Sequence, residues 1–95
     1  MTRPRIWLVD DEPMALRSLE ALLALDSRVA LVGSTTDPRR ALAAMRRGEA
    51  DILIVDIQMP GMTGIELVQS VPADQLPRVI FATAHGEYAL DAFDA

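Results

Sequence analysis

The stretch from residue 50 to residue 64, ADILIVDIQMPGMTG, constrains the fold of this chain more than any other. Four apolar residues, Ile52–Val55, run directly into Asp56, and three of the four are β-branched. A loop rich in proline and glycine follows at once. A short apolar run without polar interruption is typical of a strand buried on both faces of a parallel sheet. The sequence therefore predicts a central strand that presents the Asp56 carboxylate at its C-terminal end.

A second strand of the same kind lies near the N-terminus. Residues 6–9, IWLV, run into Asp10, Asp11 and Glu12. In open α/β sheets, ligand sites lie beyond the carboxyl ends of the strands. We therefore expect the acidic residues after the two strands to meet at one edge of the sheet.

Two helices and a strand are expected between these two strands. Pro13 suits the first helical position, and the leucines of that helix are expected to pack on the sheet: Leu16, Leu19, Leu22 and Leu23. Residues 29–32 predict a strand closed by residues 33–35. Asp37 and Pro38 open a second helix, and Gly48 suits the position just after its end. Its narrow apolar face is made by Ala41, Leu42, Ala44 and Met45.

The second half of the chain continues the alternation. Thr63 and Glu66 have the spacing of a capping box, so a helix is expected to begin near Gly64 and to end before Pro72. Residues 77–82 predict a fourth strand, and a fourth helix is expected from Glu87. The order βαβαβαβα predicts an α/β fold with a doubly wound parallel sheet and helices on both faces.

Composition limits the classes of function. A chain of 95 residues allows one domain, and a formal net charge of −5 argues against direct nucleic acid contact by this segment. There is no cysteine, which fits a reducing compartment. No stretch approaches the ~20 apolar residues of a membrane span and the N-terminus has no apolar leader, so a cytoplasmic location is expected.

The acids suggest phosphoryl chemistry with a metal. Asp10, Asp11 and Asp56 would repel one another if they converged, and Mg²⁺, which prefers oxygen ligands, would remove that repulsion. A carboxylate can then attack an activated phosphorus and become an aspartyl phosphate. Thr83, after the fourth strand, could donate its hydroxyl to a phosphoryl oxygen, together with the Ala84 backbone N–H.

Each of these residues also has a simpler interpretation. An acid at a strand end is often a turn residue or a helix N-cap, and Thr83 alone could be a turn hydroxyl. His85 could be a solvated loop residue, and Tyr88 a core or interface residue. The joint occurrence of acids after two strands and a hydroxyl after a third favours the site.

Three motifs together resemble the receiver domain of two-component response regulators. They are residues 6–13, IWLVDDEP, residues 56–64, DIQMPGMTG, and residues 81–84, FATA. The resemblance covers the whole chain and implies the flavodoxin-like strand order 2-1-3-4. It also implies a single receiver domain over residues 1–95 that is C-terminally truncated, because receivers continue into a fifth strand and helix. The lysine carried by that strand has no counterpart here, since all nine basic residues are arginines.

The resemblance also implies roles for individual residues. Asp56 would be the phosphoryl acceptor, and Mg²⁺ would be held by Asp10, Asp11, Asp56 and the backbone carbonyl of Gln58. Asp11 would bind the ion directly and Asp10 largely through water. Thr83 would be the switch hydroxyl, the Ala84 N–H would also meet the phosphoryl group, and His85 and Tyr88 would be associated with the switch.

The implied partners are a sensor histidine kinase and an output domain in a longer protein. Residues 85–93 look most like receivers attached to LytTR-type DNA-binding domains. A homodimer through the uncovered fourth strand or the fourth helix is also expected. Two other functions remain open: a phosphorylation-independent interaction module, and a Mg²⁺-dependent phosphatase with an aspartyl nucleophile. Phosphatases of the haloacid dehalogenase type carry a second acid two residues after the nucleophile, where this chain has Gln58.

Overall fold

The structure is a computed structural model that describes residues 2–82. Its elements alternate along the chain, with each helix connecting two strands. In order they are β1 (Arg5–Val9), α1 (Pro13–Ala24), β2 (Ala30–Thr35), α2 (Pro38–Arg46), β3 (Ile52–Val55), α3 (Gly64–Gln69), a 3₁₀ turn at Ala73–Gln75, and β4 (Arg78–Phe81). Among these residues no helix is both long and apolar enough to cross a membrane.

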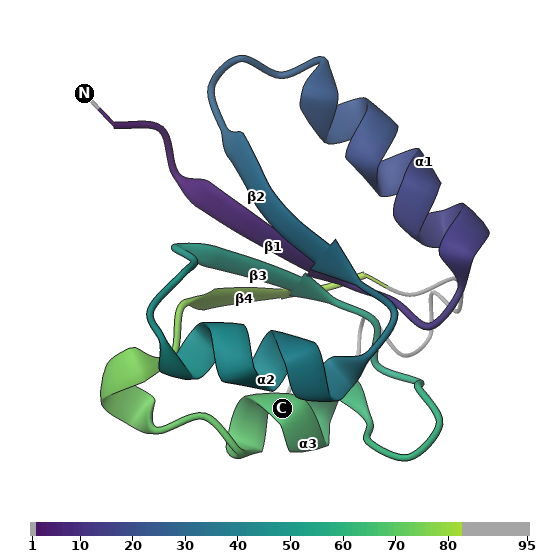
Figure 1. Cartoon of the computed structure of the whole chain (residues 1–95), viewed down its shortest axis with the longest axis vertical. Helices are drawn as coiled ribbons and strands as arrows, with labels where there is room; N and C mark the ends of the chain where they lie inside the picture. Colours follow the sequence, from purple (N-terminus) through teal and green to yellow (C-terminus); the bar gives the residue numbers. More distant parts are fainter. Residues whose placement is uncertain (1, 83–95) are drawn as a thin grey trace.

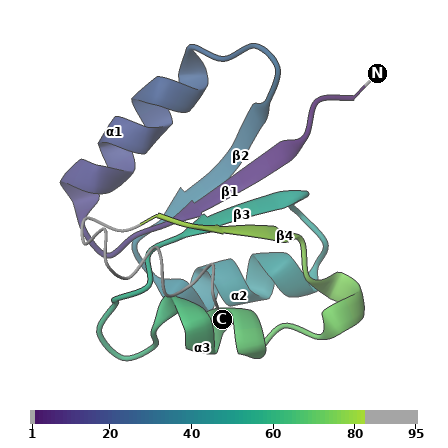
Figure 2. The ribbon, with the colours of Figure 1, turned by 180° about the vertical axis from the view of Figure 1, so that it is seen from behind.

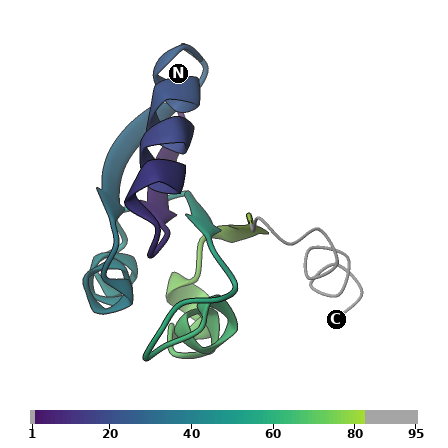
Figure 3. The same ribbon diagram turned by 90° about the vertical axis from the view of Figure 1, so that its right-hand side faces the viewer.

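The four strands form one parallel sheet in the order β2-β1-β3-β4. Helix α1 covers one face, whereas α2 and α3 lie side by side on the other (Figures 1 and 2). The view in Figure 3 shows the helices on opposite sides of the twisted sheet. The predicted doubly wound, flavodoxin-like order 2-1-3-4 is therefore confirmed. The fourth helix expected from Glu87 lies outside the described residues.

Each face of the sheet has its own apolar core, because alternate residues of a strand point to opposite faces. Ile6 and Leu8 of β1 pack with Leu16 under α1. Val9 faces the other way, into a larger cluster that contains Leu53 and Val55 of β3. That cluster also includes Ala41, Ala44, Met45, Met59, Leu67 and Val71.

The prediction that Leu22 of α1 packs on the sheet is wrong, because the exposed fraction of this residue is 65%. At about 100° per residue, Leu19 and Leu23 stay within about 60° of Leu16, whereas Leu22 is turned about 120° away. Leu19 and Leu23 do pack against the core beneath this helix. The α1 contact with the sheet is therefore narrower than the leucine count suggests.

Strand β2 is longer than predicted, since it continues through Gly33 to Thr35. A Cβ on Gly33 would lie 2.3 Å from the Trp7 indole of β1, so glycine here makes room for a neighbouring side chain instead of ending the strand. The β1–β2 register shifts between Ile6 and Trp7, where Leu31 and then Gly33 are the partners. Val32 is the extra residue of this bulge, and its exposed fraction is 47%.

Candidate functional site

The carboxyl edge of the sheet brings three aspartates together. Asp10 and Asp11 follow β1 directly, and Asp56 follows β3. Each of the three offers a carboxylate oxygen, and these oxygens lie within 4.8 Å of one another. The structure thus assembles the acidic cluster that the sequence predicts.

Backbone hydrogen bonds extend the sheet by one residue to hold these acids. The Asp56 N–H donates to the Val9 carbonyl at 3.0 Å, and the Asp10 N–H donates to the Thr35 carbonyl at 3.3 Å. Both acids are therefore fixed to neighbouring strands by their main chains. A carboxylate attached to such a backbone has little freedom to move away from its neighbours.

Asp10 is the most enclosed of the three acids, with an exposed fraction of 7%. Its Oδ1 accepts a hydrogen bond from the Glu12 backbone N–H at 2.9 Å. Burial raises the pKa of Asp10, the charge of Asp11 adds to that rise, and the Glu12 N–H opposes it. One oxygen of Asp10 is thus already engaged inside the protein.

Asp56 is partly exposed and its pKa is raised to about 6. Burial is the main cause, followed by the charge of Asp10, with a hydrogen bond to Asp11 and the Asp11 charge adding to the rise. The Gln58 backbone N–H, 3.4 Å from Asp56 Oδ1, opposes the rise. Without a metal, burial and repulsion between the acids therefore favour the protonated form of Asp56.

The donor set fits a hard divalent cation. Three carboxylates at this separation can supply several oxygen ligands and leave positions for water or a phosphate oxygen, as Mg²⁺ requires. Burial and mutual repulsion raise the pKa of Asp10 and Asp56, and the positive charge of a bound cation would lower both pKa values again. The site's chemistry thus agrees with the expected Mg²⁺.

The loop after Asp56 is anchored on both sides of the exposed Gln58. Ile57 and Met59 are buried, with exposed fractions of 8% and 5%. Gly61 has a φ of 83°, in the left-handed region that glycine adopts most readily. The side chains on either side of Gln58 therefore hold the loop while Gln58 remains accessible to solvent.

Helix α3 starts directly against this loop. The Thr63 side chain accepts from the Glu66 N–H at 3.1 Å, and the Glu66 side chain accepts from the Thr63 N–H at 3.0 Å. The predicted capping box is thus confirmed. It holds the N-terminus of the helix beside the backbone of Asp56.

Gly64 is a site residue that the sequence reasoning missed. A Cβ at this position would lie 2.2 Å from the Asp56 carbonyl oxygen, and the Gly64 N–H donates to the Ile57 carbonyl at 2.8 Å. Glycine therefore permits the close approach of α3 to the acceptor loop. The available signal was a glycine at the first position of a capped helix, where a side chain is normally tolerated.

Four of the predicted site residues lie outside the described residues: Thr83, Ala84, His85 and Tyr88. The strand that leads toward them is present, and the Ala82 N–H donates to the Val55 carbonyl at 3.0 Å. The described part of the chain therefore supplies the acids, and the roles expected of those four residues stay predictions.

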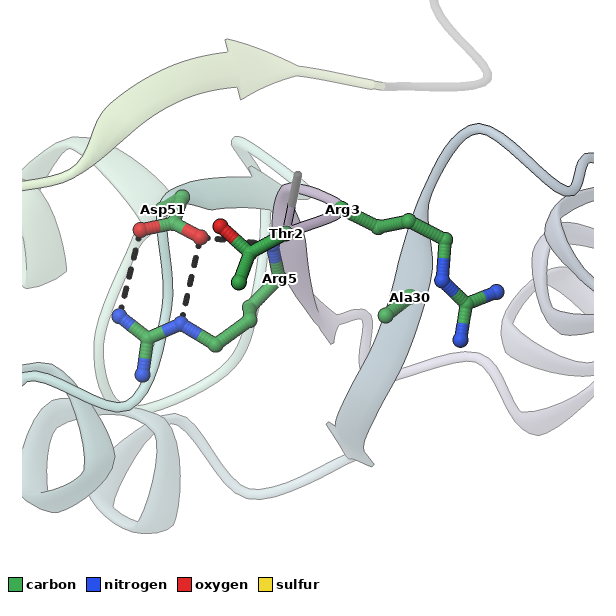
Figure 4. Close-up of a pocket in the computed structure, with 5 residues that line it drawn as sticks. All are labelled: Thr2, Arg3, Arg5, Ala30 and Asp51. Carbon is green, nitrogen blue, oxygen red and sulfur yellow. Dashed lines mark hydrogen bonds and ion pairs between the residues drawn. The ribbon is translucent and has the colours of Figure 1, made fainter.

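The amino edge of the sheet carries a different feature. Arg5 forms a two-point ion pair with Asp51, with both nitrogen–oxygen distances at 3.2 Å (Figure 4). The guanidinium lowers the pKa of Asp51. Thr2, Arg3 and Ala30 line the surrounding hollow. It lies at the opposite ends of β1 and β3 from the acidic cluster and takes no part in that site.

Comparison with known proteins agrees with this geometry. Residues 6–95 match the sequence profile of the response regulator receiver domain. The chain is 36% identical over 90 residues to the transcriptional regulatory protein BtsR of Salmonella typhi, covering 95% of this chain and 38% of that protein. It is 40% identical over 91 residues to NatR of Bacillus subtilis, covering 95% of this chain and 39% of that protein. The chain thus spans about two fifths of the length of these relatives.

Solved structures give the same result. The receiver domain of the NarL regulator from Mycobacterium tuberculosis has a TM-score of 0.79 and 30% identity, covering 90% of this chain and 69% of that one. A LuxR-family regulator from Aurantimonas has a TM-score of 0.81 and 30% identity, covering 98% of this chain and 69% of that one. These names do not support the LytTR subtype expected from residues 85–93, because they include NarL and LuxR-family regulators.

Proposed function

Because this chain belongs to the response regulator receiver domain family, we propose that it takes a phosphoryl group on Asp56 and thereby switches an output domain of a longer protein. The observation that carries this proposal is the convergence of the Asp10, Asp11 and Asp56 carboxylates within 4.8 Å. The chain is a signalling domain of a two-component response regulator and not a typical enzyme.

The proposed transfer uses the exposed side of Asp56. A carboxylate oxygen of Asp56 attacks the phosphorus of a phosphohistidine or a small acyl phosphate, and the bond from phosphorus to the donor breaks with its electron pair going to the donor. Bound Mg²⁺ would neutralise the carboxylates and the phosphoryl oxygens. Asp10, Asp11, Asp56 and the backbone carbonyl of Gln58 would hold the ion. Thr83 and the Ala84 N–H are assigned to the phosphoryl oxygens, and His85 and Tyr88 to the switch.

Protonation of Asp56 bears directly on this reaction. Its pKa of about 6 without metal means that a fraction of the carboxyl groups would be protonated near neutral pH and unable to attack. A cation beside it favours the ionised form. Since only about a tenth of the groups would be protonated one pH unit above this pKa, the larger contribution proposed for Mg²⁺ is to neutralise the acids and the phosphoryl oxygens.

The experiment is incubation of the chain with acetyl phosphate and Mg²⁺, followed by intact mass measurement. A single phosphate adduct that is absent from Asp56→Asn supports the proposal. Asp51→Asn is the matched control, since Asp51 is an acid at the opposite edge of the sheet, and it should keep the adduct. An adduct that persists in Asp56→Asn would identify a different acceptor.

The same measurement separates the two alternative functions. Turnover of acetyl phosphate without an adduct would indicate the phosphatase, against which Gln58 already argues. No reaction at all would favour the phosphorylation-independent interaction module. The absence of lysine from these 95 residues is the observation that favours this alternative.

The proposed partners follow from the family. A sensor histidine kinase would supply the phosphoryl group, and the output domain would bind DNA, as expected from relatives named transcriptional regulators. A cytoplasmic location is proposed together with these partners. The type of DNA-binding output domain is proposed from the solved relatives, which include NarL and LuxR-family regulators, and not from the likeness of residues 85–93 to LytTR-type receivers.

Self-association through β4 is the remaining proposal. In the described part of the chain β4 is an edge strand, and Ile80 on it has an exposed fraction of 47%. An apolar edge strand is a template for pairing with another chain. Sedimentation at micromolar concentration should show dimers that Ile80→Arg weakens, while Val32→Arg on the opposite edge strand serves as the control. A monomer without concentration dependence would refute this proposal.

A further inference from the structure

The outer side of α2 carries the strongest concentration of positive charge in the described chain. The segment 38–47 reads PRRALAAMRR and contains four of the nine arginines and no acid. Arg39, Arg40, Arg46 and Arg47 are all exposed. In a chain of formal charge −5, this helix is a local exception.

Helical geometry places the four arginines on one side. At about 100° per residue they fall within an arc of about 120°. Ala43 lies at its centre, and the buried residues Ala41, Ala44 and Met45 lie on the other side. Helix α2 packs on β1, β2 and α3 and lies at the margin of its layer (Figures 1 and 3), and all four arginines are exposed. We call these four residues and Ala43 the arginine face.

The arginine face is largely unpaired within the described residues. Arg47 forms an ion pair with Glu49, and the structure shows no other side-chain ion pair or hydrogen bond there for Arg39, Arg40 or Arg46. Asp37, the nearest acid in sequence, is engaged as the N-cap and accepts from the Arg39 backbone N–H at 2.9 Å. Three guanidinium groups therefore remain available to a ligand.

Two of the four arginines do not serve the stability of α2, whereas Arg46 in its last turn and Arg47 at its C-cap complement the helix dipole. Arg39 and Arg40 lie in the first turn, where the positive end of the helix dipole disfavours cations, and no acidic residue occurs in that turn. Arg39 and Arg40 are therefore exposed charges at positions that helix stability disfavours, which points to an interaction outside the chain.

We propose that the arginine face binds an acidic helical segment of a partner protein. Arg39 and Arg46, like Arg40 and Arg47, are seven residues apart, which is about 10.5 Å along the axis. Carboxylates seven residues apart on a partner helix repeat at the same distance, and arginine pairs with carboxylates through two parallel hydrogen bonds. The short side chain of Ala43 between the arginines allows close approach.

A protein partner fits better than nucleic acid. Outside α2 the chain is acidic and would repel a DNA duplex, whose charge extends well beyond four phosphates. A single acidic helix carries only a few negative charges, and these can all lie against the four arginines. Such a contact would be weakened by salt, because exposed ion pairs are screened.

The test uses an alanine-based helical peptide with glutamates at positions i, i+3, i+7 and i+10, and a matched peptide with glutamines at those positions. The chain should bind the glutamate peptide and not the glutamine peptide, with affinity falling as salt is raised. In the ¹⁵N-labelled chain, amide shifts should concentrate in residues 37–48. The double variant Arg39→Gln, Arg46→Gln should weaken binding about three- to tenfold.

The matched control is Arg17→Gln with Arg78→Gln, which removes the same charge from two exposed arginines outside α2. It should change the affinity less than about twofold. Equal weakening by both double variants, or amide shifts outside residues 37–48, would overturn the proposal. Tighter binding of a 20-base-pair duplex than of the glutamate peptide, lost in the α2 variant, would overturn it in favour of nucleic acid.

Discussion

Replacing Gly64 with alanine tests how closely α3 is fitted against the acceptor loop. Helix propensity alone predicts that alanine would stabilise the chain by ~1 kcal/mol, because glycine is a poor helix former. The structure predicts the opposite sign. An alanine Cβ would lie 2.2 Å from the Asp56 carbonyl oxygen, 3.0 Å from the Asp56 carbonyl carbon and 3.1 Å from Ile57 Cα.

The size of the effect follows from the backbone contacts. Ordinary contact begins at 3.4 Å, so the first turn of α3 and the loop must separate by about 1 Å. Overpacking of this kind costs about 1–3 kcal/mol, and losing the hydrogen bond from Gly64 N–H to the Ile57 carbonyl adds about 1 kcal/mol. After the gain in helix propensity, the net loss is about 1–3 kcal/mol, a large share of the total stability of a small domain.

The assay is urea denaturation followed by circular dichroism, together with a Mg²⁺ titration. Gly64→Ala should lower both the free energy of unfolding and the Mg²⁺ affinity, because the displaced backbone is that of Asp56. Gly48→Ala is the control, since Gly48 has a φ of 67° with no atom near its Cβ position. It should lower stability by about 1 kcal/mol and leave Mg²⁺ affinity unchanged. A Gly64→Ala protein as stable as the parent, with the same Mg²⁺ affinity, would refute the reasoning.

Three further predictions concern the acids and α1. Without metal, the pKa of Asp56 is about 6, above its ordinary 3.8, so the folded state holds this proton more tightly than the unfolded state. The free energy of unfolding should therefore fall as the pH rises from about 4 to about 6 and then level off. Denaturation of the parent and of Asp56→Asn across this range checks the prediction, and an equal slope in both proteins would contradict it. Asp11→Asn should weaken Mg²⁺ binding more than Asp10→Asn, because Asp10 Oδ1 is already occupied by the Glu12 N–H; calorimetric titration showing the reverse order would exclude this assignment. Leu16→Ala should lower the free energy of unfolding by about 2–4 kcal/mol. Leu22→Ala, at a side chain that is 65% exposed, should change it by no more than about 0.5 kcal/mol. Similar losses of stability in the two variants, measured by thermal denaturation, would show that α1 packs differently.

The acidic cluster could be predicted from the sequence because it depends on patterns within short stretches of the chain. Apolar runs end at Val9 and Val55, and parallel strands bring their carboxyl ends to one edge. The capping box at Thr63 and Glu66 is equally local, since both partners lie within four residues. Such features need no knowledge of distant contacts.

The features that escaped prediction depend on contacts between distant residues. Gly33 continues β2 because the Trp7 indole fills the space above it, and Gly64 is required by the backbone of Asp56. A glycine in isolation predicts a turn or a break, and only the neighbouring strand or loop shows that it serves close packing. Leu22 was misassigned because a count of leucines does not resolve a 120° rotation around the helix.

The distribution of charge explains why the site should depend on a cation from outside the chain. Among residues 2–82 the three ion pairs are Arg5–Asp51, Arg28–Asp26 and Arg47–Glu49, and each lies where the chain enters the amino end of a strand. The acids at the carboxyl edge have none of these pairings, and burial raises the pKa of both Asp10 and Asp56. The fold therefore neutralises its acids at one edge of the sheet and leaves them to repel one another at the other. A divalent ion that binds only the folded chain would relieve that repulsion and stabilise the fold in proportion to the logarithm of its concentration, so the same acids would couple the stability of this domain to the ion that its proposed reaction requires.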